Sequence, residues 1–330
     1  MGVRSIVLND ITCLDAAEIW MDPSDPNYVV ISGVSKMVSV EIYGPVDKHE
    51  QVILDFSGIK KVLKGIIDDP VWGFDHKLLM NFDDFAKDNV EFEAEGENVK
   101  GKMVTRKRDL LRITEPKTGK VVFKLKGKDF LRPYKGLLEN AISEHLTERV
   151  RQTYGNKEIK VQAHLSGHAV KSHDGQYRSY FQYTHGLRHS TSWGCQNMLH
   201  GHTSFVQAIN EEGHVNKRVS DLIATYLDGS YLYHEDIVKN VLGKEDEPSS
   251  LKFDDIIHTL HFKLAYKSRE RGKWTMIMPA SMCVPLDNEP TIENIVAHVA
   301  EFFKDDLNEA GIVKLVISEG LTKAGAICLY

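Results

Sequence analysis

The chain has 330 residues, enough for two domains of ordinary size. Hydrophobic residues make up 42% of it and charged residues 27%, which is typical of a folded protein and not of a disordered one. The net charge of -6 gives no overall basic field, so we do not expect a nucleic acid as a partner.

Neither a secretory signal nor an apolar run long enough to span a bilayer is found, so no membrane association is expected. The four cysteines are scattered without C-x-x-C spacing: Cys13, Cys195, Cys283 and Cys328. This spacing disfavours a disulfide framework and a thiolate zinc site. It predicts a reducing compartment, and we expect the cytoplasm.

In the first half, alternating apolar and polar residues predict a strand over 37–42, and a short strand is expected at 52–54. A helix is predicted over 55–68, where Asp55 is in the N-cap position before an apolar stripe. Polar hairpins are expected between 84 and 130, followed by a helix over about 136–153.

In the second half, a helix is predicted over 291–309, with Thr291 as its N-cap. Strands are predicted over 314–319 and 326–329. Antiparallel sheet with long helices against one face is an α+β arrangement.

The order of these elements indicates an internal repeat that covers roughly 25–165 and 178–330. Glu139-Asn140-Ala141-Ile142 in the first copy resembles Glu293-Asn294-Ile295-Val296 in the second. We therefore predict a tandem duplication with two domains, 1–172 and 173–330, where the first carries inserted hairpins at about 84–130.

The most informative motif is Cys195-Gln-Asn-Met-Leu-His200-Gly201-His202. Residues two apart on a strand point to the same face, so both imidazoles could reach one metal ion. His185 lies shortly upstream and offers a third ligand, and His189 is the alternative. Three histidines would leave one position of a tetrahedral Zn²⁺ open, as in catalytic sites. Coincidence in a chain with 15 histidines is the competing explanation.

Four motifs occur in order: Phe181 to His185, Cys195 to His202, Pro290 to Ile295, and a strand that ends at Glu319. This series resembles the 6-pyruvoyl-tetrahydropterin synthase / 6-carboxytetrahydropterin synthase family. The first half resembles the same family in other pieces, Asp55-Phe56 with Lys60 and then Phe74-Asp75-His76. Where the family has His-Gly-His, it carries Ser32-Gly33-Val34. In the second half, Tyr233-His234 is the nearest match to the Asp-His pair.

The resemblance implies two tandem T-fold (tunnelling-fold) domains, each an antiparallel sheet with two helices packed on one face. Active sites of this family lie at subunit interfaces. The first domain retains the Asp-His pair, and the second retains the metal ligands. One composite site per chain or pair of chains is therefore expected. A homo-oligomer is also expected, either a trimer or a dimer of two-domain chains.

The resemblance further implies that Zn²⁺, held by His185, His200 and His202, binds the side chain of a pterin substrate, 7,8-dihydroneopterin triphosphate. Cys195 would move the substrate proton, and His76, oriented by Asp75, would be the second acid–base group. Glu319 would bind the amino-pyrimidine edge of the pterin.

Each of these roles has an alternative. Cys195 could be a small buried side chain, Glu319 a salt-bridge partner, and His234 the base in place of His76.

Leu199 and the Ala324-Gly325 turn favour the 6-carboxytetrahydropterin synthase branch, a lyase on the route to queuosine and other 7-deazaguanines. Triphosphate elimination of the 6-pyruvoyl type is one alternative reaction. A T-fold protein that binds zinc or pterin without turnover is an alternative of another class. An unrelated zinc hydrolase is disfavoured because no H-E-x-x-H motif is present.

Overall fold

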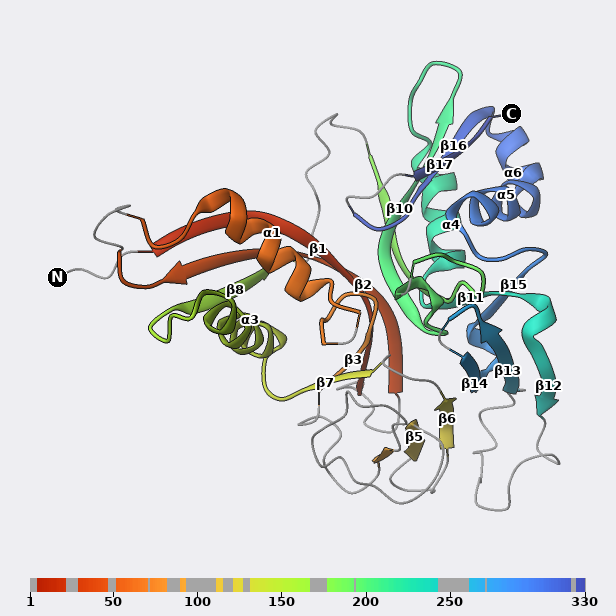
Figure 1. Ribbon diagram of the computed structural model, residues 1–330. Helices are drawn as coiled ribbons and strands as arrows, with labels where there is room; N and C mark the ends of the chain where they lie inside the picture. The colour runs from red at the N-terminus through yellow and green to blue at the C-terminus, as the bar shows by residue number, and fades with distance from the viewer. Residues whose placement is uncertain are drawn as a thin grey trace.

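The computed structural model describes thirteen stretches of the chain. They are 5–21, 29–46, 52–70, 72–81, 90–92, 111–114, 121–126, 131–166, 177–192, 194–242, 261–270, 272–321 and 325–329. These stretches form three sheets with five α-helices and three short 3-10 helices, an α+β architecture (Figure 1). The predicted α+β class is therefore confirmed.

The first sheet has five strands in the order β7-β3-β1-β2-β8. Their bounds are β1 Ser5–Met21, β2 Val29–Tyr43, β3 Leu78–Asn81, β7 Leu131–Tyr134 and β8 Lys160–Ser166. Helices α1 (Phe56–Ile67) and α3 (Leu138–Tyr154) pack against it. Both helices and the sheet contribute to one apolar core, in which Ile59, Leu63 and Ile142 are fully buried.

The second sheet has six strands in the order β15-β11-β9-β10-β16-β17. Their bounds are β9 Ser179–His185, β10 His200–Asn210, β11 Ser230–His234, β15 Cys283–Leu286, β16 Ile312–Ser318 and β17 Gly325–Leu329. Helices α4 (Lys217–Leu227), α5 (Ile292–Phe302) and α6 (Lys304–Glu309) supply side chains to the core of this sheet. The 3-10 helices are η1 Gly194–Gln196, η2 Glu235–Ile237 and η3 Ala280–Met282.

The two sheets share one strand order, since β7-β3-β1-β2-β8 corresponds to β15-β11-β9-β10-β16. In each half a hairpin is followed by a helix and a third strand, which runs parallel to the first strand of the hairpin. The outer strands β7 and β15 are parallel to their neighbours as well. The expectation of antiparallel sheets therefore holds for the hairpins and for β8 and β16, but not for β3, β7, β11 and β15, because the helix after each hairpin returns the chain in the direction of the first strand.

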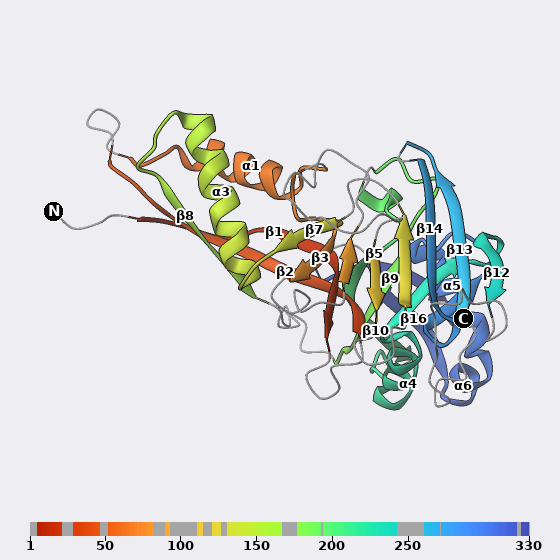
Figure 2. The same ribbon diagram turned by 90° about the horizontal axis from the view of Figure 1, so that it is seen from below.

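A third sheet, which the sequence analysis did not predict, has the order β12-β13-β14-β6-β5-β4 (Figure 2). Its strands are β4 Val90–Phe92, β5 Leu111–Thr114, β6 Val121–Lys126, β12 Val238–Leu242, β13 His261–Ser268 and β14 Gly272–Pro279. Pairing of β14 with β6, at Met276 and Leu125, joins the inserted hairpins of the first half to strands of the second half. Parts of the predicted 84–130 hairpins lie outside the described residues.

The helix predictions largely hold. Asp55 accepts a hydrogen bond from the backbone N–H of Gly58 (2.7 Å) and so caps α1 as predicted. Thr291 likewise caps α5 by accepting from the backbone N–H of Asn294 (3.4 Å). The single helix predicted over 291–309 is divided, because Phe303 has φ -99° and ψ 19° and separates α5 from α6.

The short strand predicted at 52–54 is wrong, since these residues form bends. Ile53 and Leu54 instead pack against the core of the first half, which explains their apolar character. Among the helices in the described stretches, none has both the length and the apolar character needed to cross a membrane.

The two halves meet where β2 crosses β10, and in Figure 1 the long strands β1 and β2 curve from the first sheet toward β10. A Cβ at Gly33 would lie 1.9 Å from the carbonyl oxygen of Tyr183 and 2.5 Å from the backbone nitrogen of His202. Only glycine permits this approach of backbone to backbone. The crossing positions the first half directly against the His-Gly-His segment.

Candidate metal centre and active site

Three buried histidines converge at the ends of β9 and β10. The antiparallel register pairs His200 with His185 and places His202 two residues further along β10. One ligand atom from each of the three imidazoles lies within 4.8 Å of the others, and all three side chains are at most 1% exposed. The predicted set of metal ligands is therefore brought together in the fold.

The spacing of two of the donor atoms fits a tetrahedral Zn²⁺. The Nε2 atoms of His185 and His202 are 3.2 Å apart. A tetrahedral ion with Zn–N bonds of about 2.0–2.1 Å needs an N–N separation of about 3.3–3.4 Å. The Nδ1 atom of His185 is 2.9 Å from the carbonyl oxygen of Pro290. Because a carbonyl only accepts, Nδ1 carries the proton, and the lone pair on Nε2 is left for a metal.

His76 approaches the same cluster from the first half. Its ring centroid is 5.2 Å from that of His200 and 6.3 Å from that of His202. His76, Cys195 and His200 form a second group whose potential ligand atoms lie within 4.8 Å of one another. Cys195, in η1, is half-buried. The chain thus brings the predicted acid–base residues next to the predicted metal ligands.

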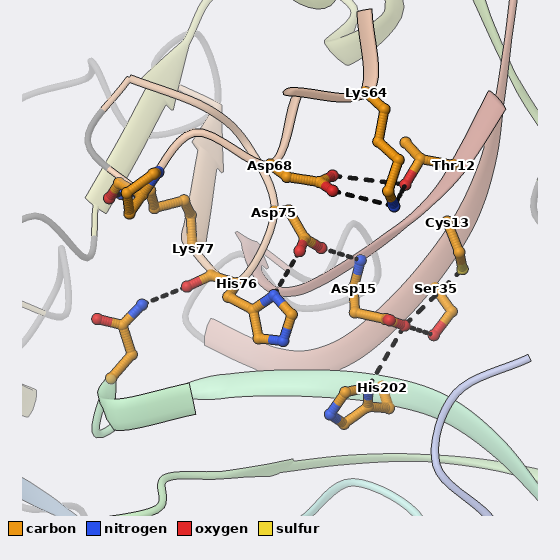
Figure 3. Close-up of polar contacts among 12 residues, drawn as sticks. Thr12, Cys13, Asp15, Ser35, Lys64, Asp68, Asp75, His76, Lys77 and His202 are labelled. Carbon is orange, nitrogen blue, oxygen red and sulfur yellow. Dashed lines mark hydrogen bonds and ion pairs between the residues drawn. The ribbon is translucent and has the colours of Figure 1, made fainter. Parts of the chain in front are cut away.

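Asp75 and His76 are anchored by several hydrogen bonds (Figure 3). Nδ1 of His76 lies 2.5 Å from Oδ2 of Asp75, and Oδ1 of Asp75 accepts from the backbone N–H of Asp15 (2.8 Å). The backbone N–H of His76 donates to the carbonyl oxygen of Asp15 (2.7 Å), and its carbonyl oxygen accepts from Asn197 in the second half. These contacts fix the imidazole from both halves.

Charge around His76 favours its protonated form. Burial by itself lowers the pKa of His76, but the Asp75 carboxylate and the hydrogen bonds with Asp75 and Cys195 outweigh it and raise the pKa to about 10. A bound divalent cation would oppose this effect by repelling the imidazolium. The arrangement is suited to a histidine that donates a proton to a bound molecule.

Glu319 follows directly after β16 and lies at the edge of the cluster. Its Oε1 atom is 3.8 Å from Nε2 of His202, and its side chain is 28% exposed. A carboxylate in this position is open to solvent on one side and faces the metal ligands on the other. It is available to N–H donors of a ligand that enters the site.

The two alternative histidines lie elsewhere. Nδ1 of His234 is 2.8 Å from Asp236, and His234 belongs to neither histidine group found among the described residues. His189 is exposed and is likewise outside both groups. Of the alternatives that the sequence leaves open, the geometry therefore favours His185 as the third ligand and His76 as the nearby imidazole.

The hydrogen-bond register also revises the match between the halves. Glu18 pairs with Leu79, and His185 pairs with Leu232, so that Asp75-His76 corresponds to Asp228-Gly229 rather than to Tyr233-His234. Asp228 accepts from the backbone N–H of Gln182 (2.8 Å), as Asp75 does from that of Asp15. Both His76 (φ 55°) and Gly229 (φ 69°) have a positive φ. The second half keeps the aspartate and the backbone turn but not the imidazole.

Asp15 was not identified from the sequence, although it lies at the centre of the site. Its side chain is fully buried on β1, where Oδ1 accepts a hydrogen bond from Ser35 and lies 3.3 Å from Nδ1 of His202. The signal in the sequence is a lone acidic residue in Leu14-Asp15-Ala16-Ala17, since buried carboxylates are rare without a partner.

No protein-family model matches the chain, and no curated protein matches it. Among solved structures, it is similar to a catalytic-residue mutant of Plasmodium vivax 6-pyruvoyltetrahydropterin synthase, at 16% identity and a TM-score of 0.28, over 47% of this chain and 96% of that chain. It is also similar to Plasmodium falciparum 6-pyruvoyl tetrahydropterin synthase, at 14% identity and a TM-score of 0.29, over 46% of this chain and 93% of that one. These identities and TM-scores are too low to establish a shared fold or function.

Proposed function

We propose that the chain is a zinc-dependent, pterin-processing lyase with one composite active site. The observation that carries this proposal is the approach of Asp75-His76 to within ring-contact distance of His200, at 5.2 Å between centroids. Three clustered, buried imidazoles, next to a thiol and an Asp-His pair, would supply a Lewis-acid position and two proton-transfer groups. The order of motifs in the sequence gives the substrate class.

We further propose that the chain consists of two tandem T-fold domains, 1–172 and 173–330. The identical strand order of the first two sheets supports this division. Glu18, Ser32 and Val34 are register equivalents of His185, His200 and His202, so the first domain has no corresponding histidine triad. One metal ion per chain follows from this asymmetry. Association of the chains into a trimer is the assembly that two T-folds per chain favour.

When bound, the metal would polarise a hydroxyl oxygen of the substrate and acidify the adjacent C–H. Cys195 would accept that proton, and His76, held by Asp75, would return a proton to the developing product. Asp75 keeps the imidazole oriented and stabilises its charge, as the 2.5 Å contact requires. Glu319 would accept hydrogen bonds from the amino-pyrimidine edge and so direct the pterin side chain toward His202.

The reaction that we propose converts 7,8-dihydroneopterin triphosphate into 6-carboxytetrahydropterin. The product keeps one carbon of the three-carbon side chain, so a C–C bond breaks and a two-carbon aldehyde and triphosphate leave, with consumption of one water. The 6-pyruvoyl product keeps all three carbons and arises by loss of triphosphate alone. The two reactions therefore differ in a small product that is simple to detect.

The test is to incubate the zinc-loaded protein with 7,8-dihydroneopterin triphosphate and to analyse products by mass spectrometry, beside the Cys195→Ala and His76→Gln variants. The 6-carboxy product, lost in both variants, is the expected result. The 6-pyruvoyl product would assign the chain to the other branch. Binding of zinc and pterin without turnover would show that the chain is a binding protein and not an enzyme.

A further inference from the structure

Asp15 is a carboxylate of the first half that is enclosed between the two halves. Its side chain has no exposed surface, and its neighbours Leu14, Ala16 and Ala17 are equally buried. Removing a carboxylate from water is costly unless hydrogen bonds or opposite charges compensate. The residues that Asp15 faces therefore indicate why a carboxylate is present there.

Asp15 is connected to the candidate metal centre in two ways. Through its side chain, Oδ1 accepts from the Ser35 hydroxyl and lies 3.3 Å from Nδ1 of His202 (Figure 3). Through its backbone, it donates to Asp75 and accepts from His76. One residue thus connects a predicted metal ligand with the predicted acid–base pair.

The orientation of His202 is suited to this connection. Its Nε2 atom faces the other ligands, 3.2 Å from Nε2 of His185, while its Nδ1 atom faces Asp15. A carboxylate at Nδ1 holds the imidazole proton there and leaves the Nε2 lone pair for a cation. Nδ1 of His185 makes a 2.9 Å hydrogen bond to the carbonyl oxygen of Pro290, whereas Nδ1 of His202 lies at ion-pair distance, 3.3 Å, from Asp15.

The other half provides an internal comparison. The register equivalent of Asp15 is Gln182, and the equivalent of His202 is Val34. The half that supplies the carboxylate thus faces an imidazole, whereas the equivalent positions of the other pairing carry a neutral amide and a valine. This difference between the halves is the one expected if the carboxylate serves the imidazole.

We infer that Asp15 is a positioning residue for the metal ligand His202, so that metal affinity of the second half depends on a carboxylate supplied by the first. This inference rests on the proposed metal site, and it goes beyond the roles assigned to the three histidines. Outer partners of metal-bound histidines contribute roughly 10–100-fold to affinity.

The experiment measures the affinity of the full chain for Zn²⁺ by competition with a chromophoric chelator, and the visible spectrum of the Co²⁺ form. Asp15→Asn is the main variant, and Asp10→Asn on the same strand is the matched control, because Asp10 is exposed and its carboxylate contacts the Ser39 hydroxyl instead of a metal ligand. Ser35→Ala is a second variant, which removes the hydroxyl that donates to Asp15 and also accepts from the backbone N–H of Thr203, so Thr203→Val is measured beside it as the control for the crossing. Circular dichroism of the metal-free proteins reports on folding.

We expect a 10–100-fold loss of Zn²⁺ affinity and a shifted Co²⁺ spectrum for Asp15→Asn, a smaller loss for Ser35→Ala, and no change for Asp10→Asn. Added to His202→Ala, Asp15→Asn should lower affinity no further, since Asp15 acts through His202. If Asp15→Asn folds and keeps Zn²⁺ affinity within twofold of the parent, the inference is overturned. If Asp15→Asn does not fold, the same result in Ser35→Ala would overturn it. Absence of Zn²⁺ binding in the parent protein would instead overturn the proposed function.

Discussion

Ser35 and Thr203 exchange hydrogen bonds where β2 crosses β10. The backbone N–H of Ser35 donates to the Thr203 hydroxyl (3.1 Å), and that of Thr203 donates to the Ser35 hydroxyl (3.0 Å). Each residue stands two positions after a glycine, Gly33 or Gly201, at which the strands touch. The reciprocal contact has the pattern of an interface between two equivalent surfaces. It sets the distance from Asp15 and His76 to the histidines of β10.

Thr203→Val should weaken this crossing, because it removes the acceptor of the Ser35 N–H without changing the shape of the side chain. We expect a decrease of about 1–3 kcal/mol in the free energy of unfolding, measured with urea. The control is Thr225→Val on the exposed face of α4, where the hydroxyl donates to a carbonyl of its own helix. Equal effects of both substitutions would contradict a special role for the Ser35–Thr203 exchange.

Gly33→Ala should disturb the crossing more strongly, since the added Cβ would lie 1.9 Å from the Tyr183 carbonyl oxygen. Backbone has to move, so we expect the free energy of unfolding to fall by about 1–3 kcal/mol or more, together with weaker Zn²⁺ binding. Gly65→Ala is the matched control, because no atom lies within 4 Å of a Cβ there. That change, inside α1, should stabilise the protein by roughly 0.5–1 kcal/mol.

Local sequence signals predicted the elements that they specify directly. Periodicity and N-caps gave α1, α3 and α5, and alternation gave β2 and β16. The break at Phe303 and the bends at 52–54 were missed, because tertiary packing decides them and an apolar run alone does not. The third sheet was missed because its central pairing, β14 with β6, joins segments about 150 residues apart in sequence, which no local pattern reports.

In the candidate site, too, residues within local motifs could be predicted from the sequence, and a residue that depends on tertiary contacts could not. His185, His200, His202 and the Asp75-His76 pair carry recognisable motifs, and the fold brings them together. Asp15 carries no motif, and its significance depends on burial against His202 from the opposite half. The counterpart of Asp75-His76 was wrongly placed at Tyr233-His234, since strand register rather than residue similarity identifies Asp228-Gly229.

Substitution of His76 and His234 should separate the two candidate bases. His76→Gln should lower turnover of 7,8-dihydroneopterin triphosphate by about 10²–10⁴-fold and leave the zinc content unchanged, because its role is proton transfer. His234→Gln should retain turnover within twofold, since His234 contacts Asp236 away from the ligands. The opposite pattern would transfer the acid–base role to His234.

The lowered pKa of His145 should make the protein less stable in acid. Burial, followed by the nearby Arg132 and Arg149, lowers the pKa of His145 to about 4, and its ring centroid lies 5.7 Å from that of Phe74. The unfolded chain binds the proton near pH 6.5, so stability is retained above that pH and decreases as pH falls from about 6.5 toward 4. The slope of the unfolding free energy against pH is proportional to the number of protons taken up on unfolding. His145→Leu should reduce that number by up to one between pH 6.5 and pH 4. His214 is exposed, so His214→Gln should leave the slope unchanged. An unchanged slope in His145→Leu would contradict the lowered pKa of His145.

If two halves of one chain build a single zinc site, the purified protein should contain one zinc ion per chain. We would measure zinc per chain by mass spectrometry of the metal in the parent protein and in the His200→Ala/His202→Ala double variant. We expect about one zinc per parent chain and none in the variant. Two zinc ions per chain would contradict the asymmetry between the halves, and a parent protein that binds no zinc would contradict the site itself.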